Sequence, residues 1–575
     1  MNQVKNKNAA SFVQGALILG IANFIVKIIG AVFKIPLINL IEDDGMGYFN
    51  VAYQIYTFMF IVATAGFPTA ISKMVSEARA RGDEAEARQV FKISFRFLAV
   101  LGLIGTLILF LFAEKLAEFV KMPDASLGIT AIAPAVFFVA LTSAYRGYFQ
   151  GRENMYPTAF SEVAESTGKM LIGLILAAFF MNMTVNPSYS GGVSIALREV
   201  ASPHTRTVLA SGGAIFGVTF GTLAACLLLS IIYLVHRIKN KVPKSEKSNK
   251  GILKMLVMIA IPITIGASVS SLTTLIDMGT ISRRLIVRPE VFENYAFMFK
   301  EETSFFEKAI AEGWQGAELL SQKAATLYGM YAGKALTMFN LPLTLVVALG
   351  TSIVPAISAS VAKSKRLEAK TITESALRIA VLFAAPCTFG MAALSKEILN
   401  LLYSDYNAYS VLAILSFAII PVALVQVSNS VLQAYGRVYK PVIHMIIGGT
   451  VKVLVNFFCI PYLGIDGAPV GTGICYLIIA VLNIRAIIKE AGIEFKWSSY
   501  IIRPVLAAFV MGVAGILLSG YIPISKFGCI IEIGICAVVY ALAIFAFKAV
   551  QKEDILALPK GEKIAEILEK YKLVR

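Results

Sequence analysis

Four residues that could bind an anion recur at helical spacing inside a strongly apolar segment near the N-terminus. Asn23, Lys27, Gly30 and Lys34 follow one another at intervals of 4, 3 and 4 in the expected helix 12–38, so they share one face. A lysine at the bilayer centre costs about 2.5–3.5 kcal/mol on insertion scales. We therefore expect this face to line the bundle interior or a wet cavity, although Lys34 is close enough to the outer end to snorkel instead.

Further lysines lie in other apolar segments. Lys334 falls in the expected helix 326–358, and Lys169 falls in the expected helix 157–180. Lys169 has Glu165 one turn earlier, and we expect these two residues to pair. The other lysines give the membrane interior an excess of positive charge, which favours an anionic ligand. Because the lysine ammonium is a compact point charge, phosphate is a suitable partner.

No catalytic or metal-binding arrangement is visible in the sequence. The histidines, His204, His236 and His444, are isolated, and the six cysteines lie in apolar segments without a CxxC pair. A glycine-rich loop with a phosphate-binding lysine is also missing. We therefore expect neither an enzyme nor a resident metal or cofactor. Transport would be driven by an ion gradient (Na⁺ or H⁺), the membrane potential or the gradient of the substrate itself.

The composition indicates an all-α, polytopic membrane protein. Of 575 residues, 57% are hydrophobic and 15% are charged, whereas about a quarter are charged in soluble domains. Apolar stretches of roughly 20 residues recur along the chain, long enough to cross a membrane. The net charge of +16 is concentrated in alternate loops, as the positive-inside rule describes, so we do not expect a nucleic-acid partner.

Fourteen transmembrane helices are expected. They fall near 12–38, 48–72, 91–113, 128–150, 157–180, 208–235, 251–279, 326–358, 374–394, 408–433, 440–461, 468–488, 500–520 and 525–548. The basic loops 73–92, 236–250 and 363–370 are predicted to be cytoplasmic, and the loops 41–47 and 463–468, which lack lysine and arginine, external. An even number of spans then places both termini in the cytoplasm.

Internal repetition divides the chain into two similar halves. The motif GFPTAIS (66–72) recurs as IVPAIS (353–358), and the Arg152 region recurs around Arg437. The offsets are 287 (Pro68 to Pro355), 285 (Arg152 to Arg437) and 283 (Lys169 to Lys452). Parallel repeats of this kind are a transporter architecture with the substrate path between the halves.

The repeat predicts three segments of the chain. Residues 1–240 form an N-terminal lobe of six helices, residues 251–490 form a C-terminal lobe of six, and residues 491–575 add two helices and a cytoplasmic tail. We assign Arg146, Arg152 and Arg437, which lie in or beside the repeated loops, to cytoplasmic gate motifs. The mixed-charge segment 283–325 is predicted to be external and amphipathic, either a cap over a cavity or a solvated connector.

Four stretches together resemble the polysaccharide-biosynthesis branch of the MOP superfamily, with its MurJ-type lipid II flippases and stage V sporulation protein B. They are GFPTAISKMVSEA (66–78), YRGYFQGRENMYPTAFSEV (145–163), YAGKALTMFNLPLTLVVALGTSIVPAIS (331–358) and QAYGRVYKP (433–441). The resemblance extends over essentially the whole chain. It implies a MATE/MurJ-like fold of fourteen helices, with a cationic cavity that carries undecaprenyl-pyrophosphate-linked sugars across the membrane.

The resemblance also implies roles for individual residues. Lys27, Lys34 and Lys334 match cations of the substrate cavity, and Asn23 and Gln54 lie beside them. The family's arginine in the second helix has no match, because only Gln54 stands there. Some family members hold sodium at positions that Asp277, Asn456 and Thr472 approach. Here Lys452 lies one turn before Asn456, so we expect its ammonium to replace the cation and pair with Asp277.

Four functions are considered from these features. The first is a lipid II flippase of peptidoglycan and cell-wall biogenesis, and the second a flippase for another lipid-linked glycan, such as a capsule or teichoic precursor. A MATE-type drug exporter would need acidic residues in its cavity, and a scaffold would not need a charged interior. We expect a monomer in the bacterial cytoplasmic membrane, in contact with membrane lipids and with cell-wall synthases as candidate partners.

Overall fold

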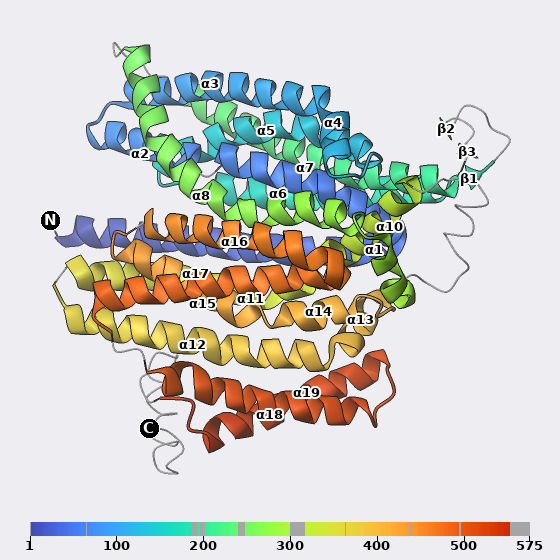
Figure 1. Ribbon diagram of the computed structural model, residues 1–575. Coiled ribbons are helices and arrows are strands. Elements are labelled where there is room, and N and C mark those ends of the chain that lie inside the picture. Colours follow the sequence, from blue (N-terminus) through green and yellow to red (C-terminus); the bar gives the residue numbers. More distant parts are fainter. Residues whose placement is uncertain are drawn as a thin grey trace. The chain divides into compact units, whose positions relative to one another are not determined.

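The computed structural model is nearly all helical (Figure 1). It describes residues 2–64, 66–186, 193–195, 199–200, 202–239, 248–298, 317–362, 364–437, 439–493 and 496–551. The chain forms two compact units, Met1–Ser282 and Arg283–Arg575, each described here by itself. Among the described residues, nine helices are long and apolar enough to cross a membrane, or ten if one bent pair is counted as a span. The number fourteen and the lobe boundaries stay predictions, and the part of the predicted cytoplasmic tail from residue 552 onward lies outside the described residues.

The first unit is a bundle of long helices with a small sheet between two of them. Its helices are α1 (Asn2–Thr64), α2 (Phe67–Ala80), α3 (Glu84–Leu111), α4 (Ala113–Phe119), α5 (Ala125–Gly151), α6 (Tyr156–Met181), α7 (Pro203–Lys239) and nearly all of α8 (Asn249–Leu285). The strands β1 (Thr184–Val185), β2 (Val193–Ser194) and β3 (Glu199–Val200) follow α6. In this sheet β3 is central, parallel to β1 and antiparallel to β2.

The first two predicted helices form the two arms of α1, which meet at a kink at Glu42, inside the expected loop 41–47. The chain stays helical through this stretch except at Glu42, where φ is 60° and ψ is −174°. This backbone conformation is one that few residues other than glycine adopt. A single non-helical residue therefore bends the chain where the sequence predicted seven residues of loop.

The basic segment 73–92 is mostly helical, and its turn is short. α2 ends at Ala80, Gly82 adopts a positive φ of 79°, and α3 begins at Glu84. The Asp83 carboxylate accepts a hydrogen bond of 2.7 Å from the backbone N–H of Glu86, as an N-cap residue does. The charges in this segment therefore stabilise helix ends, where the hydropathy pattern indicated only a loop.

Glycines bring α6 and α7 into close backbone contact. A Cβ atom added at Gly217 would lie 2.5 Å from the Cα atom of Gly173, and one at Gly221 would lie 2.3 Å from the carbonyl oxygen of Glu165. Membrane helices commonly associate through such small residues, because van der Waals packing replaces the hydrophobic effect there. The resulting contact fixes α6, which carries Lys169, against the rest of the first unit.

The second unit contains the remaining helices. They are η1 (Pro289–Met298), α10 (Ala317–Gly329), η2 (Met330–Ala335), α11 (Leu336–Ala362), α12 (Arg366–Ala393), α13 (Ser395–Tyr403), α14 (Tyr409–Ser416), α15 (Ile419–Ala434), α16 (Tyr439–Leu463), η3 (Gly464–Asp466), α17 (Gly467–Ala491), η4 (Ser498–Ile502), α18 (Arg503–Ser519) and α19 (Lys526–Ala546). The predicted helix 326–358 contains a π-helical stretch, η2. The predicted helix 408–433 is broken into α14 and α15, which meet at 46°.

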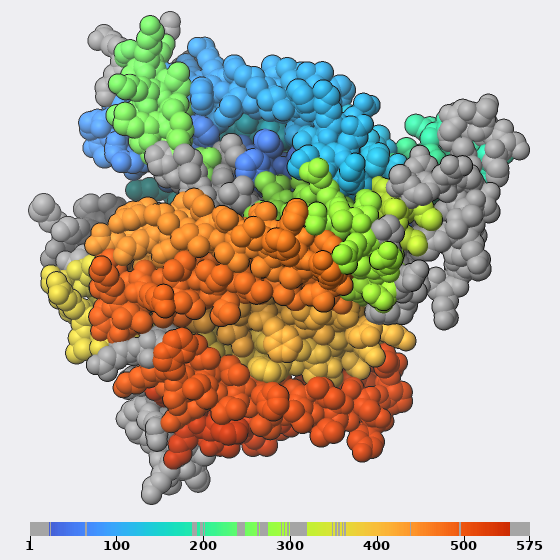
Figure 2. Space-filling model, viewed as in Figure 1, coloured from blue at the N-terminus to red at the C-terminus, as the bar shows by residue number. Residues whose placement is uncertain are grey.

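Helix α12 is the centre of the packing in this unit, because α11, α15 and α18 all contact it. α18 and α19 lie side by side at the edge of the unit (Figure 1). Their outer surface, red in Figure 2, carries exposed apolar side chains, among them Phe509, Ile516, Phe527, Ile530 and Leu542. Such a surface suits contact with lipid.

Two buried carboxyl groups lie at the contact between α13 and α19. Glu532 is 1% exposed, and neither of its carboxylate oxygens has a hydrogen-bond partner among the described residues. Glu397 of α13 is also buried and interacts electrostatically with Glu532. Around them the packing is apolar, with Leu394, Met511 and Cys536 at its centre.

The described part of the segment 283–325 is docked on the loop between α16 and α17. The Tyr295 hydroxyl donates to the carbonyl oxygen of Leu463, and it lies 3.1 Å from Oδ2 of Asp466. The Arg284 guanidinium lies 3.7 Å from the ring centroid of Phe457. Because the apolar side chains of η1 are buried in this contact, this part is more than a solvated connector. Residues 299–316 lie outside the described residues.

Candidate functional site

The polar stripe of α1, which is the predicted face with Asn23, Lys27, Gly30 and Lys34, is only partly buried. Asn23 and Lys27 are exposed, and Lys34 is half-buried. Lys27 forms no ion pair with any residue in the described ranges. Phe33, next to Lys34, is fully buried and contacts α6 at Gly173. The stripe therefore runs from an exposed lysine to a lysine at the α1–α6 contact.

Lys169 of α6 lies between the two arms of the bent helix α1. Its Nζ atom donates a 3.0 Å hydrogen bond to the Tyr53 hydroxyl. The same atom lies 4.1 Å from the ring centroid of Tyr53 and 5.2 Å from that of Phe33, within the range of cation–π attraction. Lys34 follows Phe33 in the chain, so it lies at the same contact between α1 and α6. Lysines from two helices are thus brought to one contact in the first unit.

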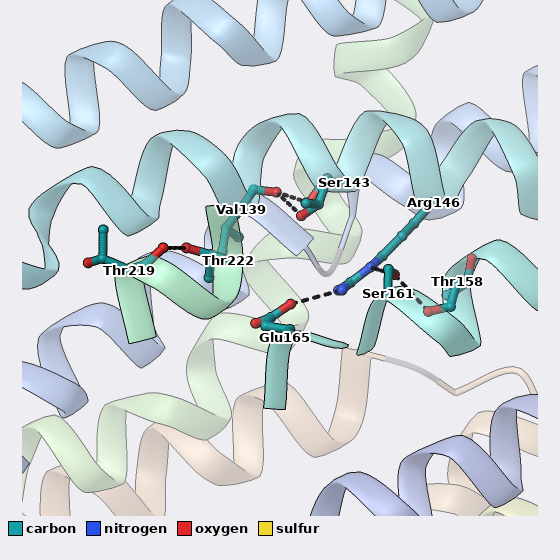
Figure 3. A network of polar contacts seen from close by, with 9 residues as sticks. Val139, Ser143, Arg146, Thr158, Ser161, Glu165, Thr219 and Thr222 are labelled. Atoms are coloured by element: carbon teal, nitrogen blue, oxygen red, sulfur yellow. Dashed lines mark hydrogen bonds and ion pairs between the residues drawn. The ribbon is translucent and has the colours of Figure 1, made fainter. Parts of the chain in front are cut away.

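The prediction that Lys169 pairs with Glu165 is wrong, because Glu165 forms an ion pair with Arg146 of α5. An Arg146 terminal nitrogen (Nη2) lies 2.9 Å from Glu165 Oε2, and Arg146 Nε donates to Ser161 Oγ at 3.0 Å. Figure 3 shows Arg146 extending from α5 toward Ser161 and Glu165 on α6. Arg146 is only 7% exposed. A buried arginine that binds two groups at once fixes a carboxylate more firmly than a flexible lysine does.

Arg152 and Arg437, the matching residues of the repeat, both bind a carboxylate of their own unit. Arg152 contacts Glu84 at the start of α3 at 2.6 Å. Arg437 contacts Glu490 at the end of α17 at 3.0 Å, and Lys440 contacts the same carboxylate at 2.6 Å. The two arginines therefore connect helix ends within each unit. Their predicted role in a cytoplasmic gate stays a prediction.

Lys334 is not the uncompensated cation that the sequence predicted. It lies in the π-helical stretch η2, and its Nζ atom is 2.8 Å from Oδ2 of Asp405, in the loop between α13 and α14. The other oxygen of Asp405 accepts a 3.2 Å hydrogen bond from the backbone N–H of Asn407. The lysine side chain is 3% exposed. Its charge is therefore balanced by a residue 71 positions away in the sequence, a distance over which no local pattern could indicate the pair.

The predicted ion-site residues of the second unit are buried together. Asn456 of α16 packs so closely on α17 that a Cβ atom at Gly471 would lie 2.1 Å from its amide oxygen. The Thr472 hydroxyl lies 3.5 Å from the Tyr331 hydroxyl of η2. Lys452, one turn before Asn456, is also buried. Asp277 is a buried residue of the first unit, and its pairing with Lys452 stays a prediction.

Sequence reasoning missed Tyr53, Tyr331 and Asp405. Tyr53 is adjacent to Gln54, which is half-buried and was singled out instead. A hydroxyl on an apolar helix carries no charge signal, so neither tyrosine stood out from the aromatic residues that fill membrane helices. Asp405 lies in a predicted loop, where an acidic residue needs no special explanation.

Comparison with known proteins agrees with this fold. Residues 12–197 match the family of polysaccharide biosynthesis proteins, and residues 320–533 match the lipid II flippase MurJ family. Stage V sporulation protein B of Bacillus subtilis (strain 168) is 23% identical over 96% of this chain and 98% of its own length. Lipid II flippase MurJ of the same organism is 24% identical over 88% of each chain.

Two solved structures share the fold. Lipid II flippase MurJ in an inward closed conformation has a TM-score of 0.63 at 14% identity, covering 92% of this chain and 98% of the other. A multidrug resistance MATE family transporter of the MOP superfamily, in an inward-facing conformation, has a TM-score of 0.61 at 12% identity, with 81% and 94% covered.

These matches and the helical fold define a multi-pass membrane protein with the fold of a transporter. Within that class, the chain is similar to the polysaccharide biosynthesis and MurJ families over these two segments, and it shares its fold with MurJ and with a transporter of the MOP superfamily. The relatives with a stated activity are flippases or transporters and not enzymes.

Proposed function

We propose that this protein carries lipid II, the undecaprenyl-pyrophosphate-linked peptidoglycan precursor, from the cytoplasmic to the outer leaflet of the bacterial cell membrane. The observation that carries this proposal is the positive charge on α1, where Lys27 is exposed and Lys34 lies at the contact with α6, the helix that carries Lys169. A pyrophosphate would compensate charges that are unfavourable in an apolar bundle. The match of residues 320–533 to the lipid II flippase family supports this choice of substrate.

In this proposal the lysines of α1 hold the diphosphate while the two halves of the chain alternate access to the two sides of the membrane. Asn23 and Gln54 would offer hydrogen bonds to the phosphate or to the first sugar. Lys334 would contribute only after it leaves Asp405, because its ammonium is already paired. Binding of the diphosphate would thus compete with an internal ion pair.

The driving force is assigned to the membrane potential or to a coupling ion, Na⁺ or H⁺. Asp277, Asn456 and Thr472 would hold such an ion if Lys452 were absent. Because Lys452 is present and buried, we propose that its ammonium takes the place of the ion and pairs with Asp277. Lys452→Ala would then create a dependence of transport on Na⁺ that the unchanged protein lacks.

A second candidate is a flippase for another lipid-linked glycan, such as a capsule or teichoic precursor. It is favoured by the match of residues 12–197 to polysaccharide biosynthesis proteins. The similarity to stage V sporulation protein B extends over nearly the whole chain and does not name a substrate. Drug export of the MATE type is disfavoured, because a cavity lined by lysines repels cationic drugs.

The test is depletion of the protein followed by a leaflet-specific assay of lipid II. Accumulation of lipid II in the inner leaflet, reversed by the unchanged gene and not by Lys27→Ala, would support the first candidate. Lys115→Ala is the control, because Lys115 is an exposed lysine on α4. A normal lipid II distribution with loss of another surface glycan would overturn the first candidate in favour of the second.

The same proposal places a monomer in the cytoplasmic membrane with both termini inside the cell. Cell-wall synthases, which consume the translocated precursor, are its candidate partners. Reporter fusions at the two ends of the chain would test the orientation, since a reporter that is active only in the cytoplasm should work at both. Activity at one end only would contradict an even number of spans.

A further inference from the structure

Lys169 is a cation in the first unit without a carboxylate partner among the described residues. Its contacts are the Tyr53 hydroxyl at 3.0 Å and the rings of Tyr53 and Phe33. The nearest acid on its own helix, Glu165, is occupied by Arg146. The aromatic contacts attract the ammonium but supply no counter-charge.

A second positive charge adds to the first. Lys34 is adjacent to Phe33, the ring of which lies 5.2 Å from the Lys169 Nζ atom at the contact between α1 and α6. Like charges in a site of low dielectric are costly, and a shared anion would turn both repulsive charges into attractive partners. A diphosphate has enough charge and enough oxygens to contact two ammonium groups at once.

The Tyr53 hydroxyl completes the arrangement. It accepts the hydrogen bond from Lys169, so its own proton is available for an acceptor. Its ring lies on the arm of α1 that follows the bend at Glu42, whereas Phe33 and Lys34 lie on the arm that precedes it. Lys169 is therefore held between two arms of one helix, and its ammonium is positioned before any ligand arrives.

We propose that Lys169, positioned by Tyr53, is a further ligand for the diphosphate of the substrate and forms an anion site with Lys34. This inference rests on the proposed function and adds two residues that neither the sequence pattern nor the family resemblance assigned to substrate. The alternative is that Lys169 only ties α6 to Tyr53. In that case, loss of the hydroxyl and loss of the ammonium would have the same effect.

Binding to the purified full-length protein in lipid nanodiscs tests the proposal. The probes are undecaprenyl pyrophosphate and the uncharged lipid undecaprenol, counted by native mass spectrometry. We expect Lys169→Met to weaken binding of the diphosphate lipid about tenfold or more, the size of one lost charge-assisted hydrogen bond. Tyr53→Phe should weaken binding only about threefold, Lys169→Arg should retain most of it, and Lys115→Met, another lysine over an aromatic ring, should leave it unchanged.

A second measurement on the unchanged protein does not depend on the folding of a variant. Reductive methylation followed by peptide mass spectrometry should show Lys169 protected by undecaprenyl pyrophosphate and not by undecaprenol. Lys115 serves as the internal reference and should react equally in both samples.

The outcomes separate the two proposals. If the unchanged protein prefers the diphosphate lipid while Lys169→Met keeps that preference and Lys169 stays reactive, the inference is overturned and the proposed function stands. Equal losses in Tyr53→Phe and Lys169→Met would assign Lys169 a structural role only. If the unchanged protein does not discriminate between the two lipids, the proposed function itself fails.

Discussion

The Nζ atom of Lys334 lies 2.8 Å from Oδ2 of Asp405, and both residues belong to the second unit. The lysine is almost fully enclosed and the aspartate is half-buried, so each charge offsets the cost of burying the other. In the first unit, by contrast, Lys169 faces aromatic rings and a hydroxyl. Among the described residues, Lys334 thus has a carboxylate partner and Lys169 has none, and for this reason we propose Lys169 as a ligand for an external anion.

Asp405→Asn should strengthen binding of undecaprenyl pyrophosphate, because the carboxylate no longer competes for Lys334. Lys334→Met should weaken it. Native mass spectrometry with the diphosphate lipid measures both effects. Lys365→Met provides the control, since Lys365 and Glu368 form an exposed pair at 3.1 Å. Equal weakening in Asp405→Asn and Lys334→Met would mean that the pair only holds the fold.

Removal of either member of the Arg146–Glu165 pair should destabilise the protein by about 3–5 kcal/mol, because a buried charge is left without its partner. The double variant Arg146→Met/Glu165→Gln should lose much less than the sum of the single losses. Thermal unfolding in detergent measures this coupling. The more exposed pair of Arg152 and Glu84 is the reference, where a coupling under about 1 kcal/mol is expected. Additive losses at Arg146 and Glu165 would show that their contact is energetically unimportant.

Gly464→Ala should loosen the docked segment η1. Gly464 has a φ of 57°, and an added Cβ atom would lie 2.2 Å from the ring of Tyr295. We expect faster hydrogen exchange in residues 289–298. Gly492→Ala is a matched control, because Gly492 has a φ of 62° and open space around its Cβ position. If residues 289–298 exchanged equally fast in both variants, the faster exchange would be explained by backbone strain at the substituted glycine and not by the contact with Tyr295.

Glu532→Met should raise the unfolding temperature. The Glu532 carboxyl is buried next to Glu397 without a hydrogen bond in the described parts of the chain, and a buried polar group without a partner costs about 1–3 kcal/mol, which an apolar side chain would avoid. Differential scanning fluorimetry of the purified protein measures the change. A lower unfolding temperature would mean that this carboxyl contributes a favourable interaction to the fold.

Hydropathy located the helices well where one apolar run corresponds to one helix. The expected helix 157–180 is observed at Tyr156–Met181, and the expected helix 468–488 at Gly467–Ala491. It placed the break between the first two helices at 41–47, which contains the kink at Glu42, but it did not show that one residue makes the bend. It also did not predict the break between α14 and α15, which lies inside a continuous apolar run.

The sequence predicted those site residues that lie on one face of the same helix, and it did not predict contacts between different helices. Spacing alone placed Lys27 and Lys34 on one face of α1. The partner of Glu165 could not be predicted in this way, because Arg146 reaches it from another helix and offers a better geometry than Lys169. Asp405 and Tyr53 were missed for the same reason: the fold, and not the local sequence, brings them to their lysines.

A π-helical turn contains an additional residue compared with the α-helix that it interrupts, and Lys334 lies within such a turn. Deleting one residue from Met330–Ala335 would convert this stretch into an ordinary α-helical turn and change the direction of the side chains within it, Lys334 included. The position of this ammonium therefore depends on the number of residues in this turn as well as on their types. A relative with a lysine in the same alignment column but without the inserted residue would direct that charge elsewhere.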